Sequence, residues 1–216
     1  MVIIMKKNIM LCVVALLAVA APGVYAEAQA PDVLIKNTAQ EVLAIVKQDK
    51  DIQAGNQKRV LELVDAKVLP HFNFTRMTRL AVGKHWRTAT EQQKKSLESE
   101  FRNMLVRTYT KAFSTYRDQV VQLKPLKMAE GATEVTVKTV IVKPGTPSIS
   151  VDYDMEQTAD GWKVYDLVVE GVSLVTSYRS TFAEQIQKDG IDGLIKTLQE
   201  KNRAAAQAGL SKADTK

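Results

Sequence analysis

The spacing of apolar residues changes twice along this chain, and this change constrains the fold more than any other feature of the sequence. Before Gln119, apolar side chains recur every three or four residues, as they do on one face of an α-helix. Between Gln119 and Gly171 they alternate with polar side chains, as in strands that are buried on one side. From Ser173 the helical spacing returns. Helices, then consecutive strands, then helices predict an α+β domain.

The clearest predicted helix begins at Thr90, which resembles a capping box together with Gln93. The opposite side of this helix is rich in charged residues, so the pattern is that of an amphipathic helix. Its apolar face consists of Leu97, Phe101, Met104, Leu105, Thr108, Ala112 and Phe113. Two earlier segments, around residues 34–46 and 60–69, show the same spacing and predict further amphipathic helices.

The clearest predicted strand carries apolar residues at every second position from Ile149 to Met155. Asp160-Gly161 predicts a tight turn into a second strand that starts at Trp162, so the two strands form an antiparallel hairpin. Ser173 is predicted to cap a helix that stops at Asp189-Gly190, and the segment from Ala204 is predicted to be a frayed, polar tail. The strands therefore predict a curved antiparallel sheet covered by amphipathic helices. Such a sheet leaves an apolar pocket at its mouth unless bulky side chains fill it.

The first 26 residues predict a cleavable secretory signal peptide. Lys6 and Lys7 precede an apolar stretch from Ile9 to Ala21, and Val24-Tyr25-Ala26 supplies small residues at the expected cleavage site. This stretch is shorter than the ~20 residues of a membrane-spanning helix. The only cysteine, Cys12, lies within it. The mature chain is therefore predicted to be exported and to contain no thiol, disulfide or cysteine-bound metal.

Removal of this peptide lowers the formal net charge from +6 to +4, which still suits an anionic partner. Export makes nucleic acid an improbable partner, and the sequence lacks the clustered basic and aromatic residues of single-strand binders. His71 and His85 do not form a zinc motif, and there is no glycine-rich phosphate loop. We therefore predict no metal site and no cofactor.

Asp166 is the one candidate for catalysis, because it interrupts an apolar strand where a buried carboxylate could act as a base. A hydrogen-bonded structural role is the favoured interpretation, since no second catalytic group accompanies it. The prediction is that the protein has no catalytic residue.

Three short motifs resemble a known family. The first runs from Trp162 to Leu174 (WKVYDLVVEGVSL) and is followed by Tyr178-Arg179 and Phe182. The second comprises Leu80-Ala81-Val82-Gly83 with Trp86, Thr90 to Gln93, Phe101 and Tyr109, and the third is Gly190-Ile191-Asp192-Gly193-Leu194. Their order and spacing resemble the MlaC, or toluene-tolerance, family of periplasmic phospholipid-binding proteins. The resemblance covers nearly all of the mature chain, so residues 27–203 are expected to form one phospholipid-binding domain.

The resemblance implies a carrier of Gram-negative bacteria that maintains outer-membrane lipid asymmetry. Its partners would be phospholipid, an outer-membrane lipoprotein–porin complex, and an inner-membrane ABC transporter complex with its MCE-domain subunit. We expect the pocket to lie between the apolar side of the strands and the long helix. The residues expected to contact lipid are Met104, Leu105, Thr108, Tyr109, Val135, Val137, Ile149, Val151, Tyr153, Trp162, Val164 and Val172. For any one of them, ordinary core packing is the alternative.

Two other functions stay open at this point. A curved sheet with helices is also the scaffold of small cone-shaped, NTF2-like enzymes, in which Asp166 would be the base that acts on an apolar substrate. A periplasmic chaperone or adaptor would instead hold protein clients on exposed apolar patches.

Overall fold

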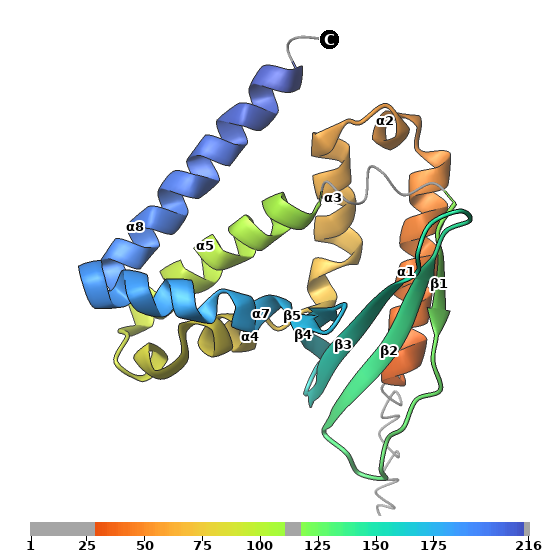
Figure 1. The fold of residues 1–216 in the computed structure, drawn as a ribbon, viewed down its shortest axis with the longest axis horizontal. Helices are drawn as coiled ribbons and strands as arrows, with labels where there is room; N and C mark the ends of the chain where they lie inside the picture. Colours follow the sequence, from red (N-terminus) through yellow and green to blue (C-terminus); the bar gives the residue numbers. More distant parts are fainter. Residues whose placement is uncertain (1–28, 111–117, 214–216) are drawn as a thin grey trace, which may run out of the picture.

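A computed structural model of the chain describes residues 29–110 and 118–213 (Figure 1). The predicted signal peptide, as well as Ala112 and Phe113 of the predicted long helix, lies outside these residues. No helix within them is long and apolar enough to cross a membrane. The helical elements that precede the sheet are α1 (Pro31–Gln48), α2 (Lys50–Gln53), α3 (Gln57–Lys67), η1 (Leu69–His71), α4 (Phe74–Val82), η2 (Gly83–Arg87) and α5 (Glu91–Tyr109).

Five strands form one antiparallel sheet in the order of the chain. They are β1 (Val120–Leu123), β2 (Glu134–Val142), β3 (Ile149–Thr158), β4 (Gly161–Val169) and β5 (Val172–Ser173). Gly161 starts β4 with a positive φ of 95°, which explains why glycine closes the predicted β3–β4 hairpin. Tyr165 is the extra residue of a β-bulge, because Asp154 pairs with Asp166 while Met155 pairs with Val164. Bulges increase twist, and the α+β class with a curved antiparallel sheet is confirmed (Figure 1).

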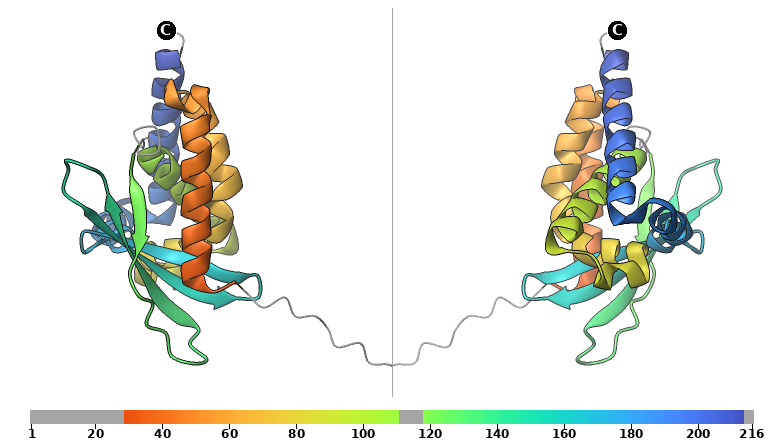
Figure 2. Two further views of the ribbon diagram at one scale, coloured as in Figure 1. Left: turned by 90° about the vertical axis from the view of Figure 1, so that its right-hand side faces the viewer. Right: turned by 90° about the vertical axis from the view of Figure 1, so that its left-hand side faces the viewer.

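Helices approach the sheet from different directions (Figures 1 and 2). Helix α1 lies over β1 and β2, and α2 and α3 continue from it. Helix α4 begins at the margin of β4, where the Asn73 N–H donates to the Val164 carbonyl at 2.8 Å. The short α7 (Leu174–Ser177) follows β5 and leads into α8 (Arg179–Ala213), which packs along α5. The sheet thus stands between α1 and the α4–α8 group.

Polar side chains fix the starts of several helices. Thr90 and Gln93 form the predicted capping box, and Ser173 caps α7 by accepting the Thr176 N–H at 3.0 Å. At Gly190, where the sequence predicts a stop, α8 bends sharply (φ 72°, ψ −179°) and then resumes. The helix continues to Ala213, so the segment expected to fray is helical in part.

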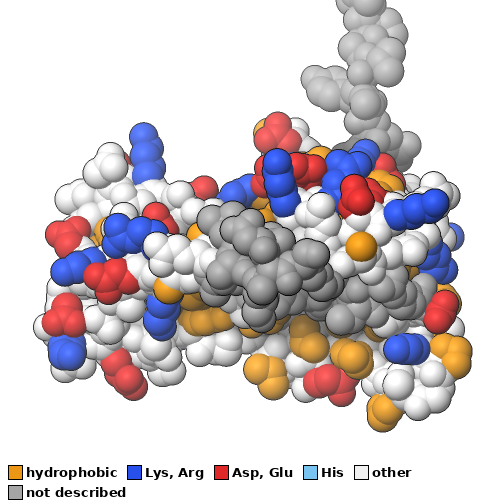
Figure 3. All heavy atoms as spheres, turned by 90° about the horizontal axis from the view of Figure 1, so that it is seen from above, with side chains coloured by type: hydrophobic (Ala, Val, Ile, Leu, Met, Phe, Trp, Pro, Cys, Tyr) orange, Lys and Arg blue, Asp and Glu red, His pale blue; other side chains and the backbone are white. Residues whose placement is uncertain are grey.

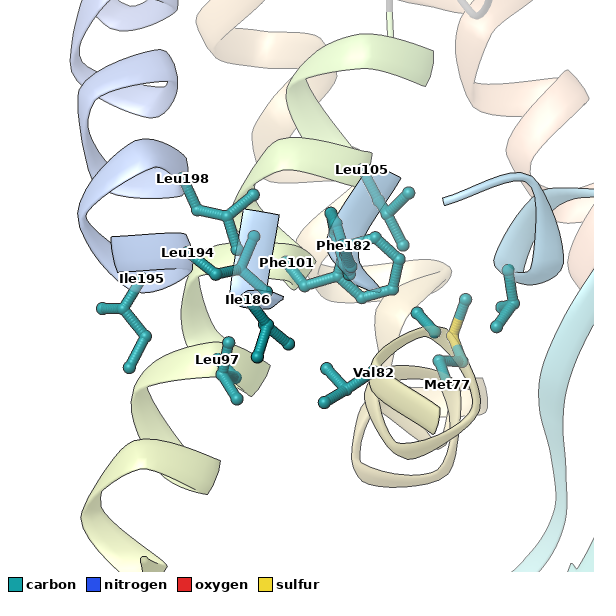
Figure 4. Close-up of a cluster of buried hydrophobic side chains, with 12 residues drawn as sticks. Met77, Val82, Leu97, Phe101, Leu105, Phe182, Ile186, Leu194, Ile195 and Leu198 are labelled. Atoms are coloured by element: carbon teal, nitrogen blue, oxygen red, sulfur yellow. The ribbon is translucent and has the colours of Figure 1, made fainter. Parts of the chain in front are cut away.

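The buried side chains form three clusters. The helical cluster joins α4, α5, α7 and α8 around Phe101, Leu97 and Leu194 (Figure 4). The sheet cluster joins Leu34 and Ile35 of α1 to the strands. A third cluster holds α1, α2 and α3 together. Phe72 packs against both the helical and the sheet cluster, which places it at the junction of these two layers.

Candidate functional site

One face of the sheet, here called the inner face, carries an almost unbroken apolar surface. Paired residues share a face, so the register assigns the members directly. They are Val121, Leu123, Val135, Val137, Thr139, Ile141, Ile149, Val151, Tyr153, Met155, Gln157, Trp162, Val164, Leu167, Val169 and Val172. The hydroxyl of Thr139 donates to the Val151 carbonyl at 2.8 Å, so this side chain has its polar atom satisfied within the sheet. Among the strand residues that the structure describes, no charged side chain lies on this face.

Exposure rises steeply from one end of the inner face to the other. At one end Val137, Met155 and Val164 are fully buried together with Leu34 and Ile35 of α1. At the other end Ile149, Val169 and Val172 are 44%, 40% and 63% exposed, and we call these three residues the open end. Val169 pairs with both Val151 and Val172, and Ile149 is two residues from Val151, so the open end is one patch.

A contiguous apolar patch of this kind is typical of a surface that binds an apolar ligand or a partner. In the view from above, hydrophobic side chains gather along the lower edge of the molecule, with few charged side chains among them (Figure 3). The patch is continuous with a buried apolar surface of the same sheet. An apolar ligand at the open end would therefore meet no polar barrier along the sheet.

The structure brings together the predicted site residues of the strands. Val135, Val137, Tyr153, Trp162 and Val164 belong to the sheet cluster. Val151 lies between this cluster and the open end, of which Ile149 and Val172 are part. All eight predicted residues of the strands thus share one surface. Their contact with a ligand stays a prediction.

The predicted site residues of α5 are not members of the sheet cluster. Met104 and Leu105 pack in the helical cluster, where Leu105 lies near Phe182 of α8 (Figure 4). Thr108 and Tyr109 are exposed near the end of α5. Burial and a hydrogen bond with Tyr109 raise the pKa of Tyr178 above its usual value, which ties Tyr109 to the helical layer. The α5 residues do not join the strand residues in one buried cluster.

The opposite, outer face of the sheet is polar and anchors α4. The Arg76 guanidinium bonds Glu156 at 2.6 Å and Glu134 at 2.8 Å, and it lies 3.5 Å from the centre of the Tyr165 ring. Asn73 also donates to Glu156, at 2.7 Å. Burial alone would lower the pKa of Arg76, but the bonds to the two glutamates outweigh it and raise that pKa. This ion-pair network connects the helical layer to the sheet.

Asp166 has the structural role favoured from the sequence. Its Oδ1 accepts the N–H groups of Leu167 at 2.8 Å and Val175 at 3.0 Å, and its Oδ2 accepts the hydroxyl of Ser173. The carboxylate is buried. It joins β4 to the start of α7, and its oxygens are occupied by donors of this chain. Within the described residues, no group of three potential metal ligands is present.

Several members of the site were missed from the sequence. Leu167 and Val169 are two positions apart on the same side of β4, so the alternation beyond the bulge could have revealed both residues. Leu34 and Ile35, which cover one end of the inner face, carry no signal beyond helical periodicity. The ion pairs of Arg76 span about eighty residues of sequence, and no local pattern predicts them.

The sequence is similar to one protein family and to individual members of known function. The model of the protein family described as MlaC protein matches residues 36–200. The toluene tolerance protein ttg2D of Pseudomonas putida is 24% identical over 177 residues, which cover 82% of each chain. The intermembrane phospholipid transport system binding protein MlaC of Haemophilus influenzae is 23% identical over 175 residues, covering 79% of this chain and 81% of that protein.

A solved structure is also similar. It is the phospholipid-binding protein from Ralstonia solanacearum in complex with a phospholipid, with a TM-score of 0.76 and 36% sequence identity. The match covers 81% of this chain and 98% of that chain.

Proposed function

The chain belongs to the MlaC family, and we propose that it is a periplasmic carrier that binds a phospholipid with the acyl chains against the inner face of the sheet. As a carrier it would move lipid between an outer-membrane lipoprotein–porin complex and an inner-membrane ABC transporter complex with an MCE-domain subunit. This transfer would maintain the lipid asymmetry of the outer membrane.

The observation that carries the proposal is the open end of the inner face. Three aliphatic side chains there stay exposed, although the rest of the same surface is buried or partly buried. Each methylene removed from water is worth ~0.8 kcal/mol, so an acyl chain of about a dozen methylenes gains roughly 10 kcal/mol from cover. An apolar face that is open at one end offers such cover without any reactive group.

Similar proteins support the proposed ligand. The Ralstonia solanacearum protein, 36% identical to this chain, was solved with a phospholipid, and the Haemophilus influenzae relative is named as a phospholipid transport binding protein. The enzyme alternative receives less support, because the Asp166 carboxylate is buried and both its oxygens accept hydrogen bonds from this chain. The exposed patch would also suit a chaperone that holds apolar client segments, so the experiment has to separate these two functions.

Native mass spectrometry of the mature protein, purified from the periplasm without detergent, is the direct test. We expect a mass increase that corresponds to about one phospholipid per chain, and lipid extraction should identify it. A protein that is empty under these conditions but binds an unfolded polypeptide would contradict the carrier and support the chaperone. Transfer of a labelled phospholipid from donor to acceptor vesicles then measures carriage separately from binding.

A further inference from the structure

The first strand of the sheet has a free edge. Strand β1 lies at the margin of the sheet and pairs only with β2 among the described residues. The Lys124 N–H donates to the Lys138 carbonyl at 2.9 Å, so this pair is a hydrogen-bonded one. Hydrogen-bonded and non-hydrogen-bonded pairs alternate in an antiparallel ladder. The N–H and C=O groups of Val121 and Leu123 therefore point away from β2, toward the free edge.

A groove runs beside this edge. It has a volume of about 420 Å³ and lies between β1 and one side of α1. Its apolar lining comes from Ala39, Leu43 and Ala44 of α1 and from Val120 and Val121 of β1. The side chain of Val120 is 55% exposed. A strand added at the edge would place alternate side chains toward α1, and the small residues of α1 leave room for them.

Charge distinguishes the possible occupants of the groove. Lys36 and Lys47 line it, and neither forms an ion pair in the part of the chain that the structure describes. Among the described residues, no acidic side chain lines the groove, and nearby Glu41 is paired with Lys67 at 2.6 Å. A second copy of this chain would bring lysines against lysines, which is a common means of preventing edge-to-edge association. A lipid surface does not present the regular alternation of donors and acceptors that pairs with the outward backbone groups of a strand.

We propose that the free edge of β1 and the adjacent groove form a docking site for an extended, acidic segment of a partner protein, which adds as a further strand beside β1. The partner would bond the backbone of Val121 and Leu123, insert an apolar side chain between β1 and α1, and pair carboxylates with Lys36 and Lys47. Val121 pairs with Ile141, and Ile141 pairs with Ile149, so the docking site and the open end lie at the same end of the sheet. Two strand spacings, about 10 Å, separate Val121 of the docking site from Ile149 of the open end.

The probe is an acetylated and amidated heptapeptide of alternating valine and threonine with a glutamate at each end. We expect it to bind the full mature protein in isothermal titration calorimetry and to protect the Val121 and Leu123 amides from hydrogen exchange. N-methylation of its alternate amides should weaken binding at least about tenfold, because the methyl groups remove the donors. A peptide with lysine at both ends should bind weakly to the wild type and better to the Lys36→Glu, Lys47→Glu double variant.

On the protein side, Val121→Pro removes one outward N–H without taking a donor from the β1–β2 ladder. It should abolish peptide binding, whereas the matched control Val121→Thr, which keeps the N–H, should retain it. The N-methylated peptide keeps the test valid even if the proline variant does not fold. Absence of binding up to about 1 mM, equal binding of the methylated peptide, or a dimer that Val121→Pro dissociates in sedimentation would each overturn the proposal. Peptide binding and lipid occupancy are measured by separate assays, so the result of one does not decide the other.

Discussion

Replacing Val172 by glutamate tests whether lipid covers the open end. Val172 is 63% exposed, so a glutamate at this position can reach water in the protein without lipid, and the stability should change by less than about 0.5 kcal/mol. With lipid bound, the same side chain would lie against acyl chains. The variant should therefore separate binding of lipid from folding of the protein.

The magnitude follows from two contributions. Full burial of a valine is worth about 1.5–3 kcal/mol, so cover of the exposed part of Val172 contributes ~1–2 kcal/mol that the variant loses. A glutamate of pKa about 4.3 must in addition turn away from the lipid or become protonated, and protonation costs ~4 kcal/mol near pH 7.5. The expected loss is about 1–2 kcal/mol if the glutamate turns away and about 5–6 kcal/mol if it is protonated, which corresponds to lipid binding that is weaker by roughly 5-fold to about 20,000-fold.

The sign of the pH dependence provides a second check. Lowering the pH to about 5 reduces the cost of protonation to ~1 kcal/mol, so the glutamate variant should regain part of its lipid. Val172→Gln is the matched control, because it is polar and similar in shape but has no charge to titrate. Native mass spectrometry at both pH values measures occupancy, and thermal melting verifies folding. A folded glutamate variant that retains as much lipid as the wild type near neutral pH would refute the placement of lipid at the open end.

Substitutions at three further positions test which side chains stabilise the fold. Asp166→Ala should lower the free energy of unfolding by about 3–5 kcal/mol, because the buried Val175 N–H loses its acceptor, and Asp166→Asn should cost less; urea denaturation measures both. Phe101→Ala should cost about 3–5 kcal/mol by the same assay, since Phe101 is fully buried and makes edge contacts with Tyr178 and Phe182. Burial, together with Lys163, lowers the pKa of His71, so the folded state resists protonation and stability should fall as the pH drops below about 6.5. The melting temperature of His71→Gln should therefore change less with pH over that range. A pH dependence identical to that of the wild type would contradict the lowered pKa of His71.

The sequence predicted those features whose causes are local. The capping box at Thr90 and Gln93, the hairpin turn at Gly161 and the cap at Ser173 each depend on residues only a few positions apart, and all are present. The alternation of Ile149, Val151 and Tyr153 likewise predicted a shared face, because side chains of a strand alternate between its two sides.

The arrangement of the layers could not be predicted in this way. The helical period placed Met104 and Leu105 on an apolar face, but it does not say which apolar surface that face meets, and the structure packs them against α8. The bulge at Tyr165 shifts every later residue of β4 by one position, so Val169 joins the inner face only because of this insertion. Contacts such as Arg76 with Glu156 depend on the assembled fold.

The division of the core explains how the inner face can keep one end open. The helical cluster and the sheet cluster each contain fully buried side chains, such as Phe101 and Leu97 in the first and Val137 and Met155 in the second. Each layer is therefore stabilised by its own burial, while Phe72 and the Arg76 network connect the two. Neither connection uses Ile149, Val169 or Val172, so a ligand can cover these residues without displacing a side chain that holds the layers together.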